Sequence, residues 1–465
     1  MTVDRPNVVV LLPDQWRYSA SGFAGNDDVM TPHVDALAED GVSFGAAFTP
    51  KPMCTPARAS LITGTHPHTN RVIHNDLSLP VERPSIGTAF KQAGYDTAYV
   101  GKWHLDGDTD LYVPPGDRRH GFDRWYGFET TAHDYDRGHP VIDDETGVTE
   151  WIDDYQPTAQ TDITIELLEA FAEESDPFFL FVSYGPPHPP KGGWSEANAP
   201  DEFSDPYDPE SLTLRPNVPE TDIQIRPHLS RVTTDRVRED LVEYYGYISS
   251  IDQEVGRVCE SLKRLGLDEE TLFVFTSDHG EMVGSQGRYN KGAPFEEANR
   301  VPLVFRHPEN LKSQRMQRQP VSLIDVMPTV LSHCNLPIPN GVQGTDLTPA
   351  FKNENSLDRD PVYVQGWRVE DDIPDEPDWG PFGQPWRLLR TERYAIVVDR
   401  TLETCYLFDV IEDPYQTINL AGNPSISDVE DELRQRLFEA CERRNDRRFI
   451  VRTEYIANRQ QFHDR

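Results

Sequence analysis

The chain has 465 residues, of which 44 are Lys or Arg and 79 are Asp or Glu, so its formal net charge is −35 at pH 7. Hydrophobic residues make up 37% and aromatic residues 10%, which predicts a globular protein rather than a disordered chain. The negative charge disfavours nonspecific binding to nucleic acid or to an anionic membrane surface, because both need a basic footprint. An anionic substrate would therefore have to be held by a local cationic pocket.

The basic residues and the cysteines also indicate the cellular compartment of the protein. Only eight lysines accompany 36 arginines, and an acidic, lysine-poor composition is typical of a high-salt cytoplasm, with an ordinary acidic enzyme as the alternative. The five cysteines are widely spaced without a CxxC pair, which predicts neither a disulfide framework nor a thiolate zinc site. The first apolar run has no basic segment before it and ends in a charged residue rather than a small-residue cleavage site, so we do not expect it to be a signal peptide, and no apolar stretch approaches the roughly 18 residues of a membrane span. We expect a cytoplasmic protein.

Apolar and amphipathic patterns alternate through the first three quarters of the chain. Continuous apolar runs predict buried strands at Asn7–Leu12, Asp96–Gly101, Phe178–Tyr184, Thr271–Thr276 and Pro302–Arg306. Helical patterns separate them at Thr31–Asp40, Ser85–Ala93, Asp235–Leu265 and Ser322–His333. This alternation predicts an α/β domain with a large, mixed but mostly parallel sheet flanked by helices, whose ligands lie outside the carboxyl ends of the strands.

The last quarter of the chain has a different pattern. Arg387–Arg400 and Thr404–Val410 are predicted as paired strands, and Ser427–Arg444 as an amphipathic helix. We therefore expect a catalytic domain over residues 1–360 and a small subdomain, an antiparallel sheet plus a helix, over residues 361–465. Four irregular segments are typical of lids or substrate loops, with plain insertions as the alternative: 106–125, 134–154, 186–227 and 370–385.

The strongest local motif is Cys54-Thr55-Pro56-Ala57-Arg58, followed by Ala59–Gly64. A Pro two residues after the cysteine, good helix formers and a closing Gly64 predict a helix that begins beside Cys54. Unpaired N–H donors and the helix dipole stabilise an anion at that end. Cys54 is thus predicted where a nucleophile meets an oxyanion, although a plain cysteine at a helix start is the alternative.

This motif resembles that of the type I sulfatases of the alkaline phosphatase superfamily. In that family a maturation enzyme oxidises the cysteine to formylglycine, whose aldehyde hydrates to a geminal diol. One hydroxyl attacks the sulfur of a sulfate ester, and the other, once deprotonated, expels sulfate. The resemblance implies an alkaline phosphatase-like fold, hydrolysis of a sugar, aryl or alkyl sulfate, and a formylglycine-generating enzyme as a partner.

Two further segments resemble the metal-binding segments of the same family. Thr276–Glu281 follows a predicted strand, as does Asp14, and the resemblance implies one divalent metal held by Asp14, Gln15, Asp278 and His279. Gln15 stands where many members carry a second Asp. Oxygen ligands with one imidazole suit Ca²⁺ or alternatively Mn²⁺. A single acid at a strand end is more often a helix cap or a salt-bridge partner.

A third set of residues would supply the cations that hold the sulfate and the proton donor for the leaving group. By resemblance Lys102 holds a sulfate oxygen, His104 contacts the nucleophile, and Arg58 holds the modified side chain. Lys291 matches the lysine that bridges sulfate and the leaving oxygen, and His188 matches the proposed general acid. A leaving alkoxide needs a proton donor, and imidazolium titrates near the working range.

The sequence leaves other functions and the substrate open. Asp14–Arg17 and Asp278–His279 also resemble the phosphonate monoester and phosphodiester hydrolases that use the same nucleophile. An unmatured anion-binding protein without catalysis is a third alternative, and a homo-oligomer is neither predicted nor excluded. Several side chains are candidates for a substrate subsite, although loop packing is the favoured interpretation of them: His133, Asp134, Trp367, Trp379 and Trp386.

Overall fold

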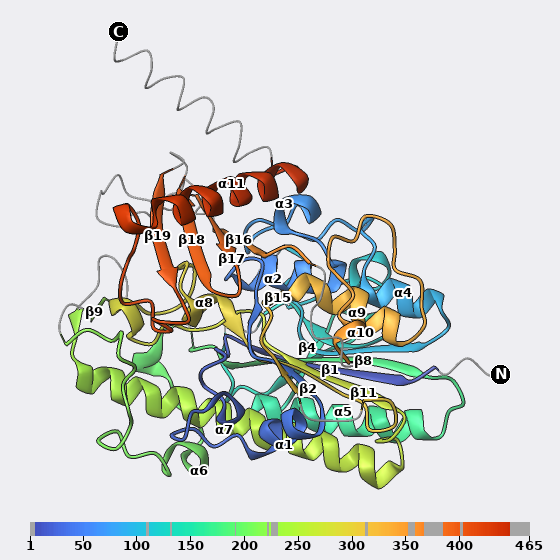
Figure 1. Cartoon of the computed structure of the whole chain (residues 1–465). Coiled ribbons are helices and arrows are strands. Elements are labelled where there is room, and N and C mark those ends of the chain that lie inside the picture. The colour runs from blue at the N-terminus through green and yellow to red at the C-terminus, as the bar shows by residue number, and fades with distance from the viewer. Residues whose placement is uncertain are drawn as a thin grey trace.

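The structure is a computed structural model that describes residues 5–107, 111–130, 133–190, 192–220, 223–224, 231–311, 315–351, 359–366, 385–399 and 403–446. Its centre is an eight-stranded sheet between two layers of helices (Figure 1). In spatial order the strands are β14 (Arg315–Gln317), β2 (Val42–Phe44), β13 (Leu303–Arg306), β11 (Thr271–Thr276), β1 (Asn7–Asp14), β8 (Phe178–Pro187), β4 (Asp96–Lys102) and β5 (Arg124–Phe128).

The sheet is mostly parallel, as predicted. β1 runs parallel to β8 and β11, and β4 runs parallel to β8 and β5. The run predicted at Pro302–Arg306 forms β13, but this strand is antiparallel to both β11 and β2. The mixed, mostly parallel α/β class is therefore confirmed, with β13 as the strand that reverses direction.

The central strands are apolar throughout because both faces of the sheet are covered. Val9 and Leu11 of β1 belong to one core, which includes residues of α1 (Pro32–Asp40), α5 (Gln156–Ala172) and α7 (Thr234–Leu265). Val8, Val10 and Leu12 belong to the other core, with α2 (Cys54–Thr63), α4 (Ile86–Gln92) and α9 (Val326–His333). Alternate side chains of one strand thus enter different cores, which explains a continuous rather than alternating apolar pattern.

The predicted helices form, with one change. The segment predicted as one helix over Ser322–His333 begins as a 3₁₀ turn, η5 (Leu323–Asp325), and only then becomes α9. The Asp325 carboxylate accepts the Ser322 backbone N–H at 2.7 Å. This bond satisfies an N–H at the helix start and accounts for the tight first turn.

A second, four-stranded antiparallel sheet follows, as predicted, and α11 (Ser427–Arg443) covers one face (Figure 1). Its strands lie in chain order: β16 (Val362–Gly366), β17 (Trp386–Arg390), β18 (Tyr394–Asp399) and β19 (Thr404–Asp409). Residues 387–400 hold two strands rather than one, because Thr391 closes a turn by accepting the Tyr394 N–H through its hydroxyl. β16 was not predicted. The other face of the sheet packs against Phe48 and Phe295.

Short elements complete the described chain. The acidic segment 134–154, predicted as irregular, contains the hairpin β6 (His139–Ile142) and β7 (Thr149–Ile152), whereas most of the segment 370–385 lies outside the described residues. The remaining elements are η1 (Gly22–Ala24), β3 (Ala47–Phe48), α3 (Pro67–Asn70), η2 (Asp117–Arg119), η3 (Trp194–Glu196), α6 (Asp201–Ser204), β9 (Ile223–Gln224), β10 (Arg231–Val232), η4 (Ser285–Gly287), α8 (Glu296–Asn299), β12 (Arg300–Val301), β15 (Val321–Ser322), α10 (Thr348–Phe351) and η8 (Pro424–Ile426). Among the described helices, none has the length and apolar content to cross a membrane.

Candidate active site

Side chains from separate segments meet at the carboxyl edge of the central sheet. Asp14 ends β1, Lys102 ends β4, and Asp278 and His279 follow β11. Cys54 is the first residue of α2, whose predicted start and Gly64 C-cap are both observed. All five side chains are buried, at 2% exposure or less. Parallel strands end at one edge, so residues far apart in sequence are brought together there.

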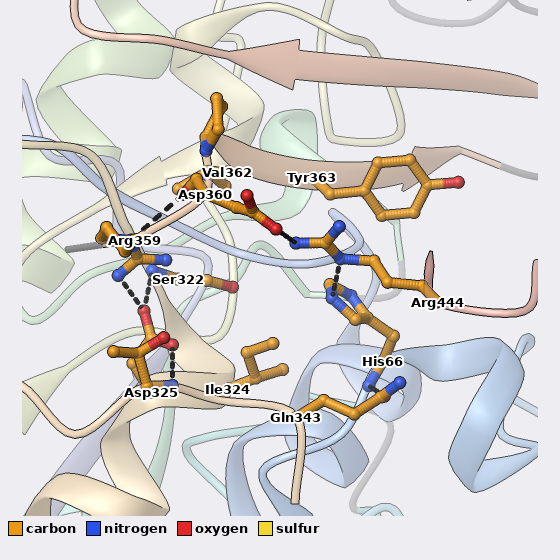
Figure 2. A pocket seen from close by; sticks show the side chains of 12 residues that line it. His66, Ser322, Ile324, Asp325, Gln343, Arg359, Asp360, Val362, Tyr363 and Arg444 are labelled. Carbon is orange, nitrogen blue, oxygen red and sulfur yellow. Dashed lines mark hydrogen bonds and ion pairs between the residues drawn. The ribbon is translucent and has the colours of Figure 1, made fainter. Parts of the chain in front are cut away.

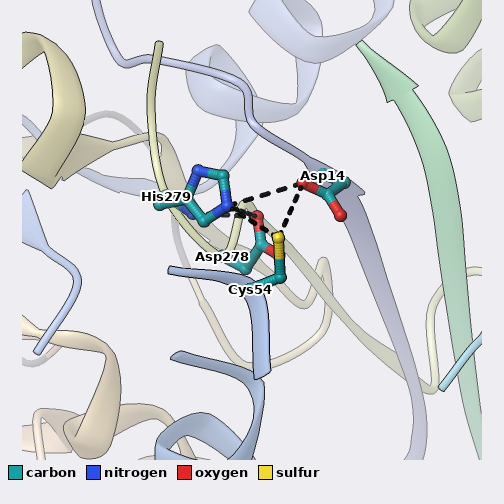
Figure 3. Close-up of side chains that lie close together, drawn as sticks. All are labelled: Asp14, Cys54, Asp278 and His279. Atoms are coloured by element: carbon teal, nitrogen blue, oxygen red, sulfur yellow. Dashed lines mark hydrogen bonds and ion pairs between the residues drawn. The ribbon is translucent and has the colours of Figure 1, made fainter. Parts of the chain in front are cut away.

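Cys54 lies at the centre of this group (Figure 3). Its Sγ is 3.2 Å from His279 Nε2, 3.3 Å from Lys291 Nζ and 3.8 Å from Asp14 Oδ1. Burial and Asp14 would raise the pKa of the thiol, but Lys291, Lys102 and His279 outweigh them and hold that pKa well below its usual range. The position predicted for a nucleophile therefore favours a negative charge.

Arg58 fixes the two carboxylates of the group. One helical turn beyond Cys54, its Nε donates to Asp278 Oδ2 at 3.0 Å and its Nη2 to Asp14 Oδ2 at 3.2 Å. Its Nη1 donates to Ser183 Oγ at 2.6 Å. With the Oδ2 atoms engaged, the Oδ1 atoms of both carboxylates face His279, and that of Asp14 also faces Cys54.

Four residues have the arrangement of a metal site. Asp14, Cys54, Asp278 and His279 each offer one ligand atom, and these atoms lie within 4.8 Å of one another. The Nδ1 of His279 is 3.0 Å from the Gly280 carbonyl oxygen, a contact that leaves Nε2 directed at the group. Two carboxylates and an imidazole aimed at one point fit a divalent cation.

Gln15, the fourth predicted metal ligand, lies beside this group with its backbone in the left-handed region (φ 72°). Its side-chain oxygen accepts from Lys291 Nζ at 2.6 Å, and its amide nitrogen donates to Glu281. Glu281 is fully buried and also accepts the backbone N–H groups of Val283 at 3.0 Å and Asn290 at 2.6 Å. Glu281 is the last residue of the motif Thr276–Glu281, but the motif alone did not single it out, because its contact with Gln15 is made across 266 positions of sequence.

Lys102 and two histidines extend the cluster from Asp14. Lys102 Nζ is 2.5 Å from Asp14 Oδ2 and 3.0 Å from His133 Nε2. The rings of His133 and His188 stack with centroids 3.8 Å apart. Burial lowers the pKa of His188 well below 6.5, and His133 and Lys291 lower it further. His133, for which loop packing was the favoured interpretation, thus lies within the polar cluster.

The remaining candidates divide between the cluster and other parts of the fold. His104 is partly buried in a left-handed conformation (φ 55°), and burial and Lys102 lower its pKa while Cys54 opposes them. Asp134 is exposed. Trp386 packs in the core of the second sheet, as the packing interpretation favoured. Trp367 and Trp379 lie outside the described residues.

A separate polar pocket of about 370 Å³ lies beyond the other end of α2. His66, Asp325, Arg359 and Arg444 line it, and their charged groups already contact one another or nearby acids (Figure 2). Because α2 has ten residues, it places about 15 Å of helix between Cys54 and this pocket. The pocket is therefore distinct from the cluster around Cys54.

Comparison with known proteins identifies the class. The sulfatase family model matches residues 6–336, and the model of the N-sulphoglucosamine sulphohydrolase C-terminal region matches residues 284–443. An ulvan-active sulfatase of Formosa agariphila is 37% identical over 438 residues, covering 93% of this chain and 80% of the relative. The chain belongs to the sulfatase family of the alkaline phosphatase superfamily, and it is a sulfatase.

Solved structures agree with this assignment. A Bacteroides thetaiotaomicron protein studied for the metabolism of multiple glycosaminoglycans superimposes with a TM-score of 0.80 at 26% identity, covering 97% of this chain and 99% of its own. The phosphonate monoester hydrolase SpPMH of Silicibacter pomeroyi superimposes with a TM-score of 0.75 at 25% identity, covering 95% and 96%. Both the sulfatase and the phosphonate branches therefore share this fold.

Proposed function

We propose that this sulfatase hydrolyses sulfate esters of saccharides through a formylglycine made from Cys54 by a separate maturation enzyme, with one divalent metal, Ca²⁺ or alternatively Mn²⁺. The observation that carries the proposal is the position of Cys54. It begins a helix, lies 3.3 Å from the Lys291 ammonium and shares a four-residue ligand group with His279 and two carboxylates. Cytoplasmic action remains part of this proposal.

The metal would be held by Asp14, Asp278 and His279, with Gln15 beside them. When bound, it supplies charge stabilisation for an ester oxygen and lowers the pKa of a coordinated hydroxyl. The fit rests on this chain's own geometry, in which Arg58 engages one oxygen of each carboxylate and leaves the other facing inward.

The cations of the cluster bind and orient the sulfate group. Lys102 is within hydrogen-bonding distance of Asp14, and Lys291 is within hydrogen-bonding distance of Cys54 Sγ. Fixed ammonium groups in a buried site stabilise negative charge as it develops on the sulfate oxygens and cost little reorganisation. His104 contacts the nucleophile and takes the proton whose removal starts sulfate release.

His188 is assigned as the proton donor to the leaving oxygen. Its ring stacks on His133, which in turn contacts Lys102, so the pair borders the sulfate-binding cations. In the ligand-free cluster burial, His133 and these cations hold the pKa of His188 well below its usual range. An anionic ester brings the opposite charge to the same place and favours the imidazolium that a poor leaving group needs.

A saccharide substrate is supported by two relatives, one described as ulvan-active and one studied in glycosaminoglycan metabolism. The likeness to SpPMH supports a phosphonate monoester hydrolase as the alternative. The sulfatase proposal and the phosphonate alternative are tested by assaying protein with converted Cys54 on a panel of sulfated saccharides, aryl sulfates and phosphonate monoesters. The proposal predicts the highest kcat/KM on a sulfated saccharide, and a higher value on a phosphonate would favour the alternative.

A further inference from the structure

The chain has two chemical forms at residue 54, and the form made by translation carries a thiol. In that form the four inward-facing donor atoms are one sulfur, one imidazole nitrogen and two carboxylate oxygens. This is a mixed S, N, O set of the kind that zinc takes. The widely spaced cysteines did not predict it, because the ligands come from three distant segments.

Four of the six distances between these donors lie near the edge lengths of a zinc tetrahedron, and the other two are within 4.8 Å. Bonds of about 2.3 Å to sulfur and about 2.0–2.2 Å to nitrogen and oxygen give ligand separations of roughly 3.3–3.6 Å. The observed separations are 3.2 Å from Sγ to His279 Nε2 and 3.8 Å from Sγ to Asp14 Oδ1. From Nε2 the Oδ1 atoms of Asp14 and Asp278 are 3.6 and 3.7 Å away. Small side-chain movements would therefore bring all four into contact with one ion.

The surroundings of the four donors are those of a prepared metal site. The Gly280 carbonyl faces Nδ1 of His279, which leaves the Nε2 lone pair for the metal. Arg58 bonds the outer oxygen of each carboxylate and so orients the inner one. The three cations Arg58, Lys102 and Lys291 offset the negative charge that a thiolate and two carboxylates leave after a divalent ion is bound.

We infer that the unconverted chain binds one Zn²⁺ through Cys54 Sγ, His279 Nε2 and the Oδ1 atoms of Asp14 and Asp278. Binding forms a bond from zinc to the Cys54 thiolate, and any proton still on the sulfur goes to solvent, so no oxidant or reductant is needed. Conversion of Cys54 removes the sulfur, and only oxygens and one nitrogen remain, a set that suits Ca²⁺ or Mn²⁺ better than Zn²⁺. This inference rests on the proposed function for the converted form only.

The test uses full-length protein in which intact mass shows that Cys54 is unmodified. A chelator first strips this protein of metal. Titration with Zn²⁺ should give one tight site per chain, and Co²⁺ used as a coloured probe should show sulfur-to-metal charge-transfer absorption. Cys54→Ser should weaken Zn²⁺ binding at least about tenfold and abolish that absorption. Cys405→Ser, which removes a thiol outside the site, should leave both unchanged.

Two results would overturn the inference: equal Zn²⁺ affinity in wild type and Cys54→Ser, or Co²⁺ binding to wild type without sulfur charge transfer. The second needs no variant, so it holds even if Cys54→Ser folds poorly. These outcomes are independent of the proposed function, because sulfate release is measured on converted protein and zinc binding on the unconverted one. A sulfatase that failed the zinc test would lose only this inference.

Discussion

At the scale of single residues, the stacked pair of His133 and His188 gives the most specific prediction about the reaction. If His188 donates the leaving-group proton, His188→Ala should slow esters with poor leaving groups by about 10²–10⁴-fold and spare activated aryl sulfates. The rate should therefore depend more steeply on leaving-group pKa in the variant. Equal loss across all leaving groups would make His188 a binding residue instead.

The same pair predicts a pH effect. Burial, His133 and Lys291 lower the pKa of His188 below its ordinary 6.5, so little imidazolium is present at neutral pH in the free enzyme. Turnover of poor leaving groups by wild type should rise as the pH falls toward that lowered pKa, and His188→Ala should lack this rise. A pH profile of kcat/KM on esters with poor leaving groups and on activated aryl sulfates measures this rise.

Glu281 positions Gln15 from outside the ligand group. Its carboxylate accepts the Gln15 amide nitrogen, which turns the amide oxygen toward Lys291. Glu281→Gln should let that amide reverse and weaken Ca²⁺ affinity by about 10–100-fold, as the loss of supporting contacts around metal ligands does. A Ca²⁺ titration of the melting temperature reports this without relying on turnover.

The control for that measurement is Glu269→Gln, which makes the same chemical change at an exposed position. It should leave the Ca²⁺ titration unchanged. Glu281→Gln protein that melts lower without metal but binds Ca²⁺ with wild-type affinity would show a purely structural role.

Short motifs predicted most of the cluster. They missed the role of Glu281 because its contact is made between distant parts of the chain. Cys54, Lys102, Asp278 and His279 each follow a recognisable strand end or begin a helix, so local patterns identify them. Glu281 acts on Gln15 across 266 positions of sequence, and such a contact leaves no local pattern. Arg58 was predicted by resemblance to hold the modified side chain, but its bonds to two carboxylates exist only once the sheet edge is assembled.

At the scale of elements, strand composition decided what could be predicted. Strands buried on both faces, such as β1 and β11, have continuous apolar runs, and the structure reproduces them. β14 and β2 have three residues each, too short to give a period. β16 was missed because Tyr363 and Gln365 interrupt its apolar pattern with polar groups that bond to Asp446.

Asp446 connects that second sheet to the end of the described chain. Its Oδ2 accepts from Arg387 Nε at 2.7 Å, and the side chains of both residues are fully buried. Burial would raise the pKa of Asp446, but Arg387 and the hydrogen bonds hold it well below its usual range. Asp446→Asn should therefore lower the free energy of unfolding by about 3–5 kcal/mol at pH 7, because the carboxylate facing a buried guanidinium is removed.

The pH dependence of this loss follows from the direction of the shift. The folded state holds Asp446 ionised to lower pH than the unfolded state does, so its contribution is complete above about pH 4, the unfolded pKa, and disappears as pH falls through the folded pKa. Denaturant unfolding of wild type and variant should converge only below about pH 4. Asp431→Asn, at an exposed ion pair, should cost less than about 1 kcal/mol, and an equal loss in both variants would contradict the prediction.

At the scale of the whole molecule, a net charge of −35 opposes the compact state through self-repulsion. Salt shortens the Debye length from about 10 Å at 0.1 M to about 3 Å at 1 M. The melting temperature should therefore rise between those KCl concentrations. An equal rise with sucrose at matched osmolarity, or no rise with KCl, would show that repulsion is not a substantial destabilising force here.

The central claim is that this sulfatase acts through a modified Cys54. The most direct test compares sulfate release from protein preparations that differ in the fraction of Cys54 converted to the aldehyde. Mass spectrometry gives the aldehyde fraction in each preparation, since conversion lowers the mass by about 18 Da relative to the thiol. Sulfate release from a sulfated saccharide should rise in proportion to that fraction and be absent in Cys54→Ala, which should fold normally because Ala is tolerated at a helix start. Equal release from fully thiol and fully converted protein would contradict the claim.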